Sequence, residues 1–148
     1  MELEKEALLV SACLMGAPCR YDGGGKMLEG LSRLEEIYDL IPVCGEVMGG
    51  MSTPRVASER VGDRVINREG EDVTEYFRRG AEEVLRIAEF CGAKKALLKE
   101  RSPSCGSGRI YDGSFTGTLR DGWGVTAERL RDAGIAVFGE SALEELLK

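Results

Sequence analysis

The chain has 148 residues, of which 43% are hydrophobic and 31% are charged, and its formal net charge is −6. This length and composition predict a single globular domain spanning residues 1–148. The acidic charge argues against nucleic acid as a partner. Because the sequence contains neither a membrane-spanning run nor a signal peptide pattern, we expect a cytoplasmic protein without membrane association.

The predicted elements alternate between strands and helices. A buried strand at residues 8–12 leads into a glycine-rich loop, a short helix follows near residues 28–36, and a second strand ends at Val43. The clearest helix begins at Thr74 and ends at Gly92. A hairpin at residues 61–67 precedes this helix, and a strand at 96–98 and a turn between extended pieces at 110–115 follow it. The last three elements are a helix at 125–133 capped by Thr126, a strand at 135–138, and a helix to residue 147 capped by Ser141. This order predicts a three-layer α/β sandwich with a mainly parallel sheet.

Three of the five cysteines follow predicted strands, in turns rich in proline, glycine and serine. They are Cys13 in S-A-C-L-M-G, Cys44 in P-V-C-G-E and Cys105 in S-P-S-C-G. Loops after parallel strands converge on one edge of a sheet, so the three thiols can meet there. Such a group suits zinc, copper(I) or an iron–sulfur cluster, with a fourth coordination position left open.

The other two cysteines have less distinctive surroundings. Cys91 ends an amphipathic helix and is expected to be a buried, structural thiol. Cys19 forms a C-x5-C pair with Cys13, and three roles stay open for it: a fourth ligand, a free thiol near the site, or simple packing.

Polar residues beside these cysteines are candidates for proton transfer and binding. The chain has no histidine, so Glu46, two residues after Cys44, is the best proton carrier if a metal site forms here. Ser102 precedes Cys105, and its hydroxyl either satisfies the backbone of a turn or bonds to substrate or cluster sulfur. Residues 20–24 form either a hairpin turn or a cradle for an anion or ring.

Several longer motifs resemble one known family, and together they cover nearly the whole chain. They are V-S-A-C-L-M-G-A-P-C-R-Y-D-G-G from Val10, P-V-C-G-E-V-M-G-G from Pro42, T-P-R from Thr53, K-E-R-S-P-S-C-G from Lys99, I-Y-D-G from Ile110 and D-G-x-G-V-T-A near Asp121. The family is the small bacterial thiouracil desulfidases. The resemblance implies a Rossmann-like fold and a [4Fe–4S] cluster that is held by three cysteines, with the fourth iron free for substrate sulfur.

The resemblance also implies roles for individual residues. Cys13, Cys44 and Cys105 are implied as the cluster ligands, Glu46 as the catalytic acid–base and Ser102 as a residue that contacts the substrate. The chain departs from the family at one point, because relatives usually have C-P-E where this chain has Cys44-Gly45-Glu46. A glycine is expected to loosen that turn.

The implied activity is the non-redox removal of sulfur from 2- or 4-thiouracil or a related thio-pyrimidine, giving uracil and hydrogen sulfide. The thione sulfur would bind the fourth iron as a soft ligand. Whether Glu46 or iron activates the attacking water stays open. The alternative is a non-catalytic module that holds zinc or a cluster. The chain has no C-x2-C pair of the kind that structural zinc sites favour.

Overall fold

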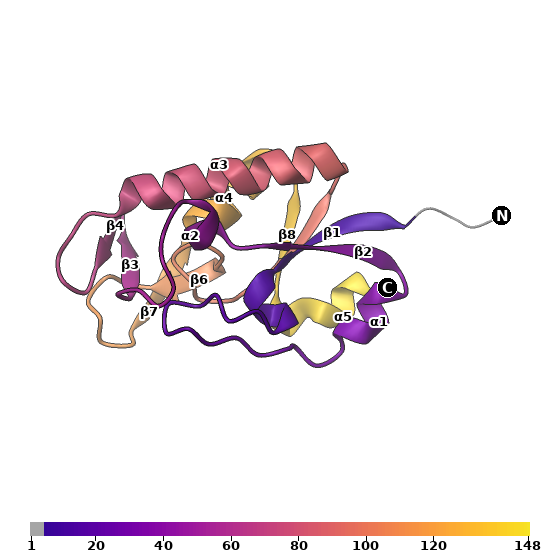
Figure 1. The fold of residues 1–148 in the computed structure, drawn as a ribbon, viewed down its shortest axis with the longest axis horizontal. Coiled ribbons are helices and arrows are strands. Elements are labelled where there is room, and N and C mark those ends of the chain that lie inside the picture. Colours follow the sequence, from indigo (N-terminus) through magenta and orange to yellow (C-terminus); the bar gives the residue numbers. More distant parts are fainter. Residues whose placement is uncertain (1–4) are drawn as a thin grey trace.

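The computed structural model describes residues 5–148, and within them the central sheet has four parallel strands. Their order is β2-β1-β5-β8, and all neighbouring pairs are parallel (Figure 1). The strands are β1 (Glu6–Ser11), β2 (Tyr38–Val43), β5 (Lys95–Leu98) and β8 (Ala136–Gly139). Because β2 lies on one side of β1 and β5 on the other, the chain reverses its winding direction at β1. A ligand crevice forms beyond the strand ends at such a point.

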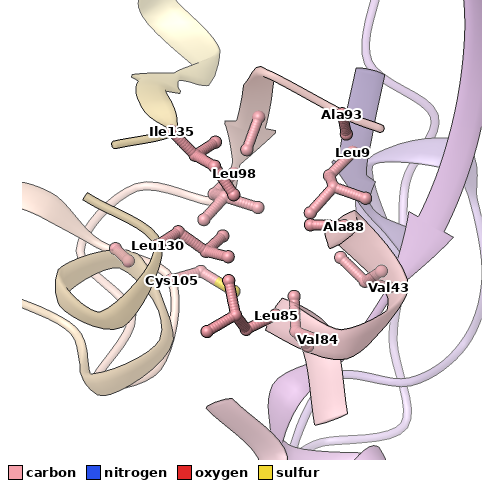
Figure 2. Packing of buried hydrophobic residues seen from close by; sticks show 12 residues of the cluster. Leu9, Val43, Val84, Leu85, Ala88, Ala93, Leu98, Cys105, Leu130 and Ile135 are labelled. Carbon is pink, nitrogen blue, oxygen red and sulfur yellow. The ribbon is translucent and has the colours of Figure 1, made fainter. Parts of the chain in front are cut away.

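Helices cover both faces of this sheet, as the alternating side chains of β1 require. Leu8 and Val10 pack with α1 (Leu31–Glu35) and α5 (Leu143–Leu146). Leu9 points to the opposite face and packs with α3 (Thr74–Cys91) and α4 (Val125–Asp132) (Figures 1 and 2). The predicted three-layer α/β sandwich is therefore confirmed.

The longest helix, α3, has the ends that the sequence predicts. It begins at Thr74, and Gly92 ends it with a left-handed φ of 68°. Its buried positions recur every three or four residues and form one apolar face toward the sheet. They include Phe77, Ala81, Val84, Leu85 and Ala88.

Two antiparallel hairpins lie beyond the carboxyl ends of the parallel strands (Figure 1). The first pairs β3 (Ser58–Val61) with β4 (Arg64–Asn67), and the second pairs β6 (Ser107–Tyr111) with β7 (Leu119–Trp123). The first hairpin turns at Gly62, which has a φ of 60°, as its sequence predicts. Both hairpins contribute walls to the cavity described below.

Both predicted helix caps are wrong. Gly124 occupies the N-cap position of α4, and the Thr126 hydroxyl is buried and hydrogen-bonds the Ser104 hydroxyl at 2.9 Å. Ser141 lies in the 3-10 turn η2 (Glu140–Ala142), and its hydroxyl donates to Glu100 Oε2 at 2.6 Å. In both cases a tertiary hydrogen bond replaces the local one that the sequence pattern suggests.

Two short helical turns escape the sequence patterns. They are η1 (Ala12–Met15) and α2 (Gly45–Met48), each four residues long. One turn is too short to show a helical period. Both turns carry residues of the candidate site, Cys13 in η1 and Glu46 in α2.

None of the helices in residues 5–148 has the length and apolar character needed to cross a lipid bilayer.

Candidate functional site

The loops that follow β1, β2 and β5 open into one cavity of about 590 Å³. Its walls include every site residue that the sequence predicts, together with the thiol whose role stayed open. These residues are Cys13, Cys19, Cys44, Cys105, Glu46 and Ser102. The cavity lies at the reversal of strand order, where the α/β architecture places ligands. Cys91 is on α3 and is not among the lining residues.

Each of the three predicted ligands is held by its own local structure. Cys13 lies in η1, and its carbonyl accepts the amides of Gly16 and Lys26 at 3.2 and 3.0 Å. Cys44 is extended at the N-cap of α2, with a φ of −144°, and its carbonyl accepts the Met48 amide at 2.8 Å. Backbone hydrogen bonds thus hold the segments that carry both thiols.

Cys105 is positioned by Ser102. The Ser102 Oγ accepts the backbone amides of Ser104 and Cys105, both at 3.0 Å, so the serine closes the turn that presents the thiol. Figure 2 shows Cys105 beside Leu85 and Leu130, on the α3 and α4 side of the sheet. Ser102 therefore satisfies the backbone of the turn, which is one of the two roles that the sequence suggests for it.

The pKa values of three thiols in the cavity wall are raised first by burial and then by neighbouring thiols. Burial, and then the Cys44 thiol, raise the pKa of Cys13 above its usual value. Burial raises the pKa of Cys105 to about 12, although the Ser11 hydroxyl opposes this. Burial and then Cys44 and Cys13 raise the pKa of Cys19 to about 12. Burial therefore favours the protonated thiols of Cys13 and Cys105, and a metal that bound these two cysteines would have to displace their protons.

The donor set suits an iron–sulfur cluster. Across residues 5–148, no three cysteine, aspartate or glutamate side chains converge closely enough to hold one metal ion. A cubane cluster does not require such convergence, because each thiolate binds a different iron at a different corner. Three soft thiols from three loops around one cavity therefore suit an iron–sulfur cluster.

Glu46 points to the same cavity from α2 and is paired with a buried arginine that the sequence analysis did not single out. Arg55 Nε donates to Glu46 Oε1 at 3.1 Å. Arg55 belongs to the T-P-R motif, which resembles the family but carries no predicted role of its own. Its role could not be found from spacing, because the two partners are nine positions apart, across a short helix and a loop.

The glycine that departs from the family pattern is tightly packed. A Cβ at Gly45 would collide with the hydroxyls of Ser104 and Thr126, which are bonded to each other. Gly45 is buried, and α3 presses on its carbonyl through Gly80, where a Cβ would also collide. This close packing opposes the loosening that a glycine is expected to cause at this turn.

Replacing Gly80 with alanine is expected to destabilise the protein and displace Cys44 and Glu46. Helix propensity alone favours alanine by about 1 kcal/mol. The collision with the Gly45 carbonyl should outweigh it, because overpacking typically lowers the free energy of unfolding by about 1–3 kcal/mol. Denaturant unfolding of the metal-free protein measures the change, and Glu89→Ala on the exposed side of α3 is the control. A more stable Gly80→Ala protein would mean that α2 is free to move away from α3.

The rest of the cavity wall carries further charged groups that sequence patterns did not indicate. Lys99 Nζ donates to Glu140 Oε1 at 2.8 Å, which ties the loop after β5 to the end of β8. Glu59 is buried, and its Oε1 accepts the amides of Gly113 and Phe115 at 2.9 and 3.0 Å. The Lys99–Glu140 pair and the hydrogen bonds to Glu59 each join segments that are more than 40 positions apart in sequence.

Residues 20–24 form a turn closed by backbone hydrogen bonds, but the described residues that flank it form no strands, so it is not part of a hairpin. The Arg20 amide donates to the Gly24 carbonyl at 3.0 Å, and the Gly23 amide donates to the Arg20 carbonyl at 2.8 Å. Arg20 and Tyr21 nevertheless line the cavity, so the turn also forms part of its wall.

Comparison with known proteins finds similar chains over nearly the whole length. YbbK of Bacillus subtilis (strain 168), described as an uncharacterized protein, is 40% identical over 150 residues, covering 95% of this chain and 99% of that protein. The solved structure of TudS, a [4Fe-4S]-dependent thiouracil desulfidase, superposes with a TM-score of 0.91 at 49% identity, covering 96% of this chain and 95% of the TudS chain. The model of the 2-thiouracil desulfurase family matches residues 8–142. The chain belongs to the 2-thiouracil desulfurase family.

Proposed function

We propose that this protein is a [4Fe–4S]-dependent desulfidase that removes sulfur from thiolated uracil and releases hydrogen sulfide. The observation that carries the proposal is the meeting of Cys13, Cys44 and Cys105 with Glu46 around one cavity. Family membership and the similarity to TudS support the same activity. The substrate is a thio-pyrimidine, and the reaction exchanges one sulfur atom for one oxygen atom.

The three cysteines are the proposed ligands of the cluster. When bound, the cluster supplies an iron without a protein ligand, which acts as a soft Lewis acid toward a thione sulfur. Cys19 lies in the same cavity but is not assigned as a ligand in this proposal.

Glu46 is the proposed acid–base. Its carboxylate takes a proton from the water that attacks the carbon bearing sulfur, and later returns a proton as sulfur leaves. Water supplies the new carbonyl oxygen and two hydrogens, and the products are uracil and hydrogen sulfide. No electrons are gained or lost, so the reaction needs no reductant or oxidant.

Ser102 is the proposed substrate contact. A serine hydroxyl has two acceptor lone pairs and one hydrogen to donate. The amides of Ser104 and Cys105 already use the acceptor side of Ser102 Oγ. Its hydrogen is therefore directed away from this turn, and because Ser102 lines the cavity, a ring oxygen or nitrogen of the substrate can accept it.

The test is anaerobic reconstitution with iron and sulfide, followed by an assay of sulfide release. We expect stoichiometric cluster formation with a visible absorption band. Release of sulfide from 2-thiouracil, 4-thiouracil or their nucleosides and nucleotides should match the appearance of the oxygen-containing pyrimidine. Exposure to air should remove the activity, because an iron without a protein ligand is lost first, and ferrous iron with reductant under anaerobic conditions should restore it.

The alternative, a non-catalytic module, predicts a different result in the same experiment. Four thiols line the cavity, the number that a structural zinc site uses, although no three of them converge on one point within residues 5–148. A colourless protein that holds one zinc per chain and releases no sulfide from any substrate in the panel would support that alternative. Full activity in a sample purified in air and free of iron would exclude the cluster mechanism.

A further inference from the structure

We propose that Arg55 is a positioning residue, whose guanidinium holds the Glu46 carboxylate in the orientation needed for proton transfer. The proposal rests on the acid–base role proposed for Glu46. It assigns Arg55 to the orientation of that carboxylate and not to contact with the substrate.

The Arg55–Glu46 pair is enclosed by protein. Only 5% of the Arg55 side chain and 17% of the Glu46 side chain are exposed. Exposed ion pairs hold their partners weakly, since both side chains remain free to move in water. Here the arginine has little room to move, so its 3.1 Å contact between Nε and Glu46 Oε1 restricts the carboxylate.

The guanidinium is itself fixed by three further acceptors. Nη1 donates to the Ser52 carbonyl at 3.1 Å and to Thr53 Oγ1 at 3.0 Å, and Nη2 donates to the Cys19 carbonyl at 2.9 Å. These bonds and the bond to Glu46 use four of the five N–H groups of the planar fork. A guanidinium held in this way is a rigid support, with little capacity left to bind a substrate anion.

The backbone around Arg55 joins the same two segments. The Arg55 amide donates to the Tyr21 carbonyl at 2.8 Å, and Nη2 reaches the carbonyl of Cys19. The loop after β1 is thereby tied to the loop after α2. The orientation of Glu46 consequently depends on the segment that contains Cys19, which is 36 positions from Arg55 in sequence.

The hydrogen bond from Arg55 leaves one oxygen of the Glu46 carboxylate for proton transfer. Oε1 of Glu46 accepts from Arg55, whereas Oε2 has no hydrogen bond to any side chain or amide in residues 5–148. The Glu46 backbone is fixed independently, because α2 packs on α3 and the Glu46 carbonyl accepts the Met51 amide at 3.1 Å. Arg55 therefore controls the side-chain torsions that the backbone leaves free.

A double-mutant cycle between Arg55 and Glu46 tests the proposal in the reconstituted enzyme. We expect Arg55→Met to lower kcat about 10- to 100-fold, as loss of an outer supporting residue usually does, with KM changed less than about twofold. In the Glu46→Gln background the same substitution should lower kcat less than about twofold further, because no proton-transferring carboxylate is left to orient. Arg55→Lys retains the positive charge but not the planar fork of N–H donors, so it should lower kcat to a similar extent as Arg55→Met.

Iron content, the visible band and the thermal unfolding of the cluster-free protein separate this effect from a loss of structure. All three should stay near wild type in Arg55→Lys. If Arg55→Met fails to fold, the cycle is run with Arg55→Lys. Arg60→Met is the matched control. Arg60 is a similarly buried arginine, with 12% of its side chain exposed, that donates to the Trp123 carbonyl at 2.7 Å outside the cavity.

Equal losses of kcat in the two backgrounds, or loss of the cluster in both Arg55 variants, would overturn the proposal in favour of general structural support. A wild-type kcat in Arg55→Met would overturn it as well. Failure of the proposed function is distinguishable, because the wild-type enzyme would then release no sulfide at all.

Discussion

Replacing Cys13, Cys44 or Cys105 with serine is expected to abolish cluster retention and sulfide release in each of the three variants. A hydroxyl is a harder and far less acidic ligand than a thiol, so it is a poor substitute for a thiolate on iron. Each of the three residues comes from a different loop of the cavity wall, and none has a neighbouring C-x2-C partner to take its place. Iron and acid-labile sulfide per chain, with the visible absorption band, measure retention after anaerobic reconstitution.

The remaining cysteines provide matched controls for this experiment. Cys91→Ser should keep both the cluster and the activity, because Cys91 lies on α3 and not in the cavity wall. Cys19→Ser should keep the cluster, although Cys19 is in the wall. If Cys19→Ser lost the cluster while Cys13→Ser kept it, the proposed ligand set would be wrong.

Glu46→Gln is expected to leave the cluster spectrum intact and to lower turnover by about 10²–10⁴-fold, the range typical of a lost acid–base group. The amide has the shape of the carboxylate and can still accept from Arg55, but it cannot exchange a proton at neutral pH. Substrate binding should survive, because a soft thione–iron contact does not require the carboxylate. Single-turnover kinetics measure the chemical step, and a substrate-induced change in the visible spectrum reports binding.

A Glu46→Gln enzyme with near-normal turnover would remove Glu46 from the mechanism. The attacking water would then have to be activated without a carboxylate. Ser102, the proposed substrate contact, would be the next residue to test. Ser102→Ala is a poor control here, since Ser102 also closes the turn that presents Cys105. Lys99→Met is the better comparison, because Lys99 lines the same cavity but pairs with Glu140 and not with Glu46.

Local patterns were sufficient to predict the four strands of the central sheet and the longest helix, but not the short turns η1 and α2. The strands that become β1, β2, β5 and β8 are short apolar runs, and the apolar period of α3 ends at a glycine with a left-handed φ. The parallel arrangement follows from the alternation of strands and helices. From that arrangement alone the three separated cysteines are expected at one edge of the sheet, and the cavity lined by all three is found there.

Local sequence patterns thus predict the α/β architecture, the shared location of Cys13, Cys44 and Cys105, and the presence of Glu46 beside them. How these groups are held is seen only in the folded chain: Arg55 contacts Glu46, Ser104 contacts Thr126, and Gly80 contacts Gly45. The two kinds of feature differ in the range of the interactions that produce them. Strand, turn and helix signals arise between residues a few positions apart, whereas each of these contacts joins separate segments whose approach depends on the packing of the whole core.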